Sequence, residues 1–114
     1  MTAVYEHVLT PAAEKFEEFH FANPGVYNTL VELAHKWRER HPGKKISIAL
    51  LVEVARWEHM MLLTYDANSE FKISNSYRAF YARLMMHNHP EFDGLFNIKS
   101  SEADEWVRIR TAQL

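Results

Sequence analysis

Residues 47–63 read SIALLVEVARWEHMMLL, and this stretch decides the helical character of the chain. Ser47 is a good N-terminal cap, and apolar residues cover most of the circumference of the helix that follows. Such a helix is typically central and buried, so we expect it at the middle of the fold. Its main polar interruptions, Glu53, Arg56 and His59, are three residues apart and align in one stripe. The stripe is either a polar network in a cleft or, as we favour, an internal ion pair with a neighbour.

Further helices are expected on both sides of this stretch. Each begins at a residue whose side chain can cap a helix, and two of these caps precede proline, which suits the first helical turn. Apolar residues recur at helical spacing in the segments concerned. The expected helices begin at Thr10, at Asn23, at Ser74 or Asn75, and at Ser101, and the second and fourth helices end near Arg40 and Asn88.

Strand signals are short and few. Phe71–Ile73 alternates in polarity, and Leu95–Lys99 and Lys45–Ser47 are further candidates, so a small β-hairpin is expected. The expected fold is mainly α, a single compact helical domain over residues 1–114. Its helix, strand and helix order resembles a winged helix-turn-helix with a core at about residues 24–99. A plain helical bundle with a minor hairpin explains the same pattern.

Composition narrows the class of protein. The 114 residues are 47% hydrophobic and contain no cysteine, which excludes disulfides and thiolate metal sites. The N-terminus lacks the features of a signal peptide, and no stretch approaches the length of a membrane span, so we expect a cytoplasmic protein with no membrane partner. The tryptophans at positions 37, 57 and 106 fall at core-compatible helical positions, and we expect all three in the core.

Basic residues gather in the middle of the chain, between two acidic ends, although the net charge is −2. A cluster of cations at the end of the second expected helix could meet phosphate, or it could simply offset the negative end of the helix dipole. The cluster consists of Lys36, Arg38, Arg40, Lys44 and Lys45.

The fourth expected helix is the candidate DNA reader. Arginine can recognise guanine, asparagine can recognise adenine, and lysine contacts phosphate. We assign phosphate contacts to Lys44, Lys45, Lys72 and Arg78, and positions nearer the bases to Asn75 and Arg83. The opposite face, formed by Ala79, Ala82 and Met86, is small and apolar. It could allow close approach to DNA, or it could pack on another helix or a partner.

Metal and enzyme chemistry have weaker signals. His87 and His89, with acidic residues close by, form the densest ligand cluster, but no histidine pair shows the helical spacing of a zinc motif. We assign no metal site and no cofactor. The string Glu70-Phe71-Lys72 matches the acid-x-Lys pattern of some metal-dependent nucleases, which need another acid and a supporting sheet. Nucleophile elbows and phosphate-binding glycine loops are absent, so the sequence favours a non-enzymatic protein.

Several segments carry a resemblance to a known group of proteins. The segments are FANPGVY at 21–27, LVELA at 30–34, EVARWE at 53–58 and EFKISNSYRAFYARLM at 70–85. Together they resemble a family of small, largely uncharacterised proteins from phages, prophages and bacteria. The resemblance covers roughly residues 20–99 and implies a phage-associated role, for which DNA binding and inhibition of a host system are natural candidates. It implies no catalytic residues.

Three functions follow as hypotheses. The first is a non-enzymatic, winged-helix-like domain that binds double-stranded DNA. The second is a protein-interaction module, either a homodimer or an inhibitor of a host protein, suggested by the apolar third helix and the small apolar face of the fourth. The third is a metal-dependent nuclease.

Overall fold

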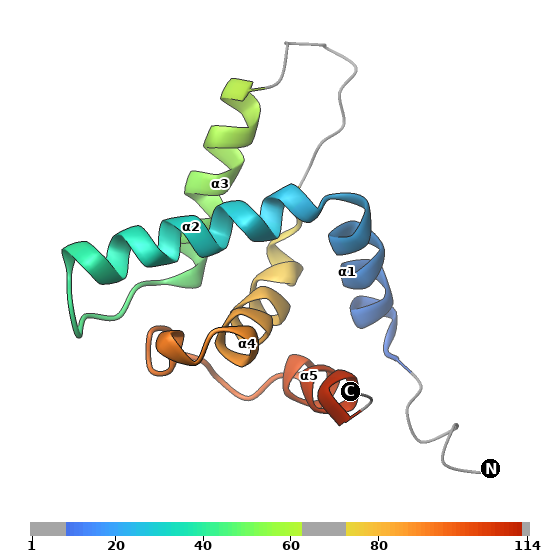
Figure 1. Ribbon diagram of the computed structural model, residues 1–114. Helices are drawn as coiled ribbons and strands as arrows, with labels where there is room; N and C mark the ends of the chain where they lie inside the picture. The colour runs from blue at the N-terminus through green and yellow to red at the C-terminus, as the bar shows by residue number, and fades with distance from the viewer. Residues whose placement is uncertain (1–8, 63–72, 113–114) are drawn as a thin grey trace.

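The computed structural model describes residues 9–62 and 73–112, and these form helices joined by short connections (Figure 1). The elements are α1 (Pro11–Ala22), α2 (Pro24–Arg40), α3 (Ile48–Leu62), the 3-10 turn η2 (Asn75–Tyr77), α4 (Arg78–Asn88), the 3-10 turn η3 (Pro90–Phe92) and α5 (Glu102–Ala112). The expectation of a mainly α fold is confirmed. Within these described ranges, no helix is both long and apolar enough to cross a membrane.

The helices begin where the capping residues predict. The hydroxyl of Thr10 accepts a hydrogen bond from the amide of Ala13 at 3.2 Å, and Ser47 does the same for Ala49 at 3.1 Å. Asn23 is an exception, because its side chain gives no cap to α2 and instead donates to the Phe19 carbonyl at 3.0 Å. It therefore closes the C-terminal end of α1, while the proline after it starts α2.

The core has an aromatic centre at Phe16, which is fully buried. Its ring stacks on Phe80 with centroids 5.0 Å apart and meets Tyr81 and Trp106 edge-on at 4.8 and 5.1 Å. Every α-helix contributes buried residues to the same cluster: Ala13 and Phe16 from α1, Val26, Leu30 and Ala34 from α2, Leu51, Val52 and Ala55 from α3, Phe80, Tyr81, Ala82 and Met85 from α4, and Ala103 and Trp106 from α5.

The expectation that the third helix is central and buried is wrong for its second half. Helix α3 crosses α2 and then extends beyond the body of the fold (Figure 1). Its buried positions lie in the first half, whereas Trp57, Met60 and Met61 are 64%, 67% and 66% exposed. Trp57 therefore lies outside the core, contrary to expectation, while Trp106 is 5% exposed, as expected. Trp37 is half-buried against the core.

The expected β-hairpin and the winged-helix form that depends on it are not supported, because the described residues contain no strand. Leu95–Lys99 and Lys45–Ser47 are irregular, and one backbone hydrogen bond, from Ile46 to the Leu95 carbonyl at 3.0 Å, joins them. The Lys99 carbonyl accepts a hydrogen bond from the side chain of Arg83 rather than from a strand partner. Residues 71 and 72 of the other expected strand lie outside the described residues.

Candidate functional site: a cationic groove

A groove of about 780 Å³ opens between the starts of three α-helices. Its lining includes Ala79 and Ala82 of α4. The small apolar face expected to be open on this helix is instead covered, because Ala82 is fully buried and Ala79 and Met86 are half-buried against the core. None of the described residues that line the groove is acidic, and four are cationic. The cationic residues are Lys45, Arg78, Arg83 and Lys99.

Three of these cations are available to a ligand. Lys45 is exposed, with its ammonium 3.0 Å from the side-chain oxygen of Asn97, and Lys99 is exposed on the segment before α5. Arg78 is half-buried, and its Nε donates to the Asn75 carbonyl at 3.0 Å. Asn75 and Asn97 are neutral, so they orient the cations without cancelling their charge.

Arg83 differs from the other three because its charge is already compensated. Its side chain is 6% exposed and donates to Asp104 at 2.8 Å, and it also donates to the carbonyls of Ala79 and Lys99. These contacts tie α4 to α5 and to the wall of the groove that carries Lys99. Arg83 therefore positions the groove, and its guanidinium is not free to read a base.

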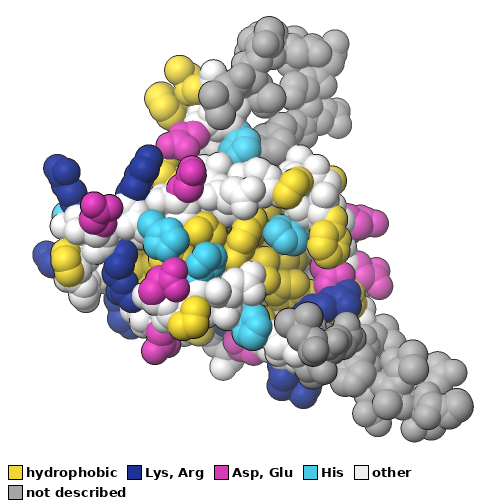
Figure 2. Space-filling model, in the orientation of Figure 1, with side chains coloured by type: hydrophobic (Ala, Val, Ile, Leu, Met, Phe, Trp, Pro, Cys, Tyr) yellow, Lys and Arg dark blue, Asp and Glu magenta, His cyan; other side chains and the backbone are white. Residues whose placement is uncertain are grey.

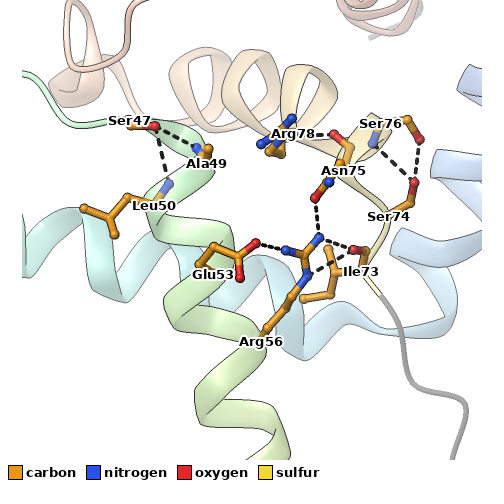
Figure 3. A network of polar contacts seen from close by, with 10 residues as sticks. All are labelled: Ser47, Ala49, Leu50, Glu53, Arg56, Ile73, Ser74, Asn75, Ser76 and Arg78. Carbon is orange, nitrogen blue, oxygen red and sulfur yellow. Dashed lines mark hydrogen bonds and ion pairs between the residues drawn. The ribbon is translucent and has the colours of Figure 1, made fainter.

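A second polar network fixes the opposite wall (Figure 3). Arg56 of α3 pairs with Glu53 on its own helix and reaches across to the Ile73 carbonyl and to the side-chain oxygen of Asn75 at 2.6 Å. Figure 3 shows Arg78 between Asn75 and the start of α3. The outcome differs from the expected internal ion pair with a neighbour, because Glu53 is 61% exposed and pairs with Arg56 on its own helix, while His59 lies 3.4 Å from the Thr29 hydroxyl. Arg56 nevertheless holds the start of α4 in place through Asn75.

Helix N-termini add a favourable field to the same groove. The starts of α3 and α4 line the groove through Ser47, Ile48, Ala49, Asn75, Ser76 and Arg78. Ser100 and Ser101 before α5 also line it, but the first turn of α5 is acidic and the Ser101 amide donates to Asp104, so the favourable field comes from α3 and α4. The N-terminal end of a helix carries a partial positive charge and amides that favour anions. Together with three lysine and arginine side chains, this arrangement suits a phosphate-bearing ligand.

The groove collects four of the six residues predicted to contact nucleic acid: Lys45, Asn75, Arg78 and Arg83. Lys44 is exposed beside Lys45 but does not line the groove. Lys72 and the acid-x-Lys string around it lie outside the described residues. Lys99 also lines the groove but was not predicted from the sequence. The one local indication is its position two residues before the helix cap at Ser101.

The histidine cluster expected at His87 and His89 is divided between two places. His87 lies with His20 along a shallow groove between α1, α4 and α5. His89 lies beside His35 and Glu91, with His35 Nε2 at 2.9 Å and His89 Nδ1 at 3.2 Å from the same Glu91 oxygen. The histidine that shares Glu91 with His89 is therefore His35 of α2 and not His87.

Comparison with known proteins adds no relative. No protein-family model, no curated protein and no solved structure matches the chain.

Proposed function

We propose that the protein binds nucleic acid non-enzymatically, through the sugar–phosphate backbone of a duplex seated along the cationic groove. The observation that carries this proposal is a groove lined by four cationic and no acidic described residues in a chain whose net charge is −2. Positive charge concentrated in one concave place, against the sign of the whole molecule, is typical of an anion-binding surface.

The groove also sets the mode of binding. Lys45, Arg78 and Lys99 each provide one charge for a phosphate, while Arg83 is engaged with Asp104. Three phosphate contacts release about three counterions, so the logarithm of affinity should fall with the logarithm of salt concentration with a slope of about −2.7. Between 50 and 200 mM salt, affinity should then drop about 40-fold. Asn75 offers only its side-chain nitrogen to a base edge, because its Oδ1 already accepts from Arg56.

Fluorescence anisotropy of a labelled, mixed-sequence DNA duplex at low salt tests the proposal. Lys45→Ala and Lys99→Ala should each weaken binding and reduce the salt slope by about one. Lys36→Ala is the matched control, because it removes the same charge from an exposed position outside the groove. Equal losses in Lys36→Ala and in the groove variants would show that net charge, and not the groove, attracts DNA.

The second candidate is self-association through α3. Leu50, Trp57 and Met61 are all more than half exposed, and with half-buried Val54 they recur at intervals of four, three and four residues. That spacing is the seam of a two-stranded helix pair, so a second copy of the same helix would fit it.

Light scattering across a concentration series distinguishes this candidate. A dimer that Trp57→Glu converts to a monomer would support it, because a charge at the centre of an apolar seam is costly to bury. Glu58→Ala, a change on the neighbouring position, is the control. A monomer at every concentration would exclude the homodimer.

A further inference from the structure

Two imidazoles and one carboxylate converge at the end of α4, away from the groove at its start. His35 comes from α2, His89 caps the C-terminal end of α4, and Glu91 belongs to η3. One potential ligand atom from each residue lies within 4.8 Å of the other two. Figure 2 shows histidine side chains gathered on the face of α2 and α4, with an acidic side chain beside them.

The distances suit a tetrahedral metal ion. Zinc binds nitrogen and oxygen ligands at about 2.0–2.1 Å, so two ligands of a tetrahedral site lie about 3.3 Å apart. The Glu91 oxygen is already 2.9 Å from His35 Nε2 and 3.2 Å from His89 Nδ1. The two nitrogens lie within 4.8 Å of one another, so coordination of one ion requires them to move closer by rotation of an imidazole ring.

The three residues are held in place by neighbours that do not themselves bind. The fully buried ring of Phe92 packs against His35 and His89, with centroids 4.7 and 5.2 Å away. Arg38 donates to the main-chain carbonyls of Glu91 and Asp93 and so fastens η3 to α2. These contacts limit the movement of the two imidazole rings and of η3.

One further contact orients the end of α4. The side-chain amide of Asn88 donates to the hydroxyl of Tyr27 on α2 at 3.0 Å.

From this geometry we infer that His35, His89 and Glu91 form a binding site for a divalent transition metal of the zinc type. Two imidazoles and a carboxylate are a ligand set that zinc accepts, and three protein ligands leave the fourth tetrahedral position open to water or a further ligand. Coordination requires that Nε2 of His35 and Nδ1 of His89 carry no proton. The ion would join α2, α4 and η3.

Calorimetric titration of the full chain with zinc chloride tests this inference. Wild type should bind one ion per chain at the site, and His35→Ala and Glu91→Gln should each weaken the affinity at least about tenfold. His87→Ala is the matched control, since it removes an exposed histidine that is close in sequence but outside the cluster. Its affinity should equal that of wild type.

Two results would overturn the inference. One is an absence of saturable zinc binding by wild type. The other is an affinity that survives both His35→Ala and Glu91→Gln, or that falls equally in His87→Ala. Glu91→Gln changes only an exposed carboxylate, so it gives a result even where His35→Ala fails to fold. The visible spectrum of the cobalt-loaded protein provides a second reading, because tetrahedral coordination gives intense bands that Glu91→Gln should diminish.

Discussion

Replacing Arg83 with alanine is the sharpest test of how the groove is built. The side chain is 6% exposed, and it joins Asp104 of α5, the Lys99 carbonyl and the Ala79 carbonyl. Its removal leaves the half-exposed Asp104 carboxylate to be hydrated by water. The loss is therefore smaller than for a fully buried pair, in which the remaining charge stays unpaired.

The magnitude follows from these contacts. Hydrogen bonds to charged groups contribute about 1.5–3 kcal/mol, and truncating the buried stem of the side chain removes further packing, so we expect a loss of about 3 kcal/mol in the free energy of unfolding. Total stability for a domain of this size is about 5–15 kcal/mol, so the variant should still fold. With a urea dependence of about 1.5 kcal/mol per molar, the midpoint should fall by about 2 M.

Urea unfolding followed by circular dichroism measures this shift. Arg108→Ala is the matched control, because Arg108 also pairs with a carboxylate, Glu105, but on the exposed surface of α5. Its midpoint should barely change. A shift below about 0.5 M in Arg83→Ala would refute the positioning role, since it would mean that the three contacts contribute little to the native state.

Three further predictions concern the core. Burial raises the pKa of Glu17, but hydrogen bonds from Arg110 and Trp106 lower it more, so the pKa lies below the ordinary 4.5. The stabilisation by ionised Glu17 should be complete above pH 4.5 and be lost as the pH falls through the pKa of the folded state. Glu17→Gln should flatten this acid dependence in urea unfolding. Burial raises the pKa of Tyr81, and its hydroxyl has no hydrogen-bond partner among the described residues. Tyr81→Phe should therefore raise the free energy of unfolding by about 1 kcal/mol, and a lower thermal midpoint would contradict this. Phe16→Ala should lower the free energy of unfolding by about 3–5 kcal/mol, because it empties the centre of the aromatic cluster. Urea unfolding measures this loss, and a value below about 1 kcal/mol would show that the cluster does not hold the helices together.

The helices were predictable because their signals are local. Capping at Thr10 and Ser47 depends on residues two or three positions away, and the pairing of Ser101 with Asp104 spans a single turn. The exposure of Trp57 was not predictable in this way. An apolar helix is buried only where another element covers it, and where α3 leaves α2 depends on how the two helices cross.

The candidate site was predictable in its residue types but not in its assembly. Lys45, Asn75 and Arg78 were expected at a nucleic-acid surface, and they meet in one groove. Arg83 was expected near the bases, yet a carboxylate 21 positions away engages it. His35 joins a histidine more than fifty positions later, and no local pattern reveals such a pair.

The salt dependence of duplex binding tests the proposed groove most directly. Wild type should bind a mixed-sequence duplex with a slope of about −2.7 in a double-logarithmic plot, and Lys45→Ala/Lys99→Ala should give a slope near −0.9, as for one remaining phosphate contact. Lys36→Ala should keep the wild-type slope. Absence of binding at 50 mM salt, or one common slope for all three proteins, would contradict the assignment of the groove to nucleic acid.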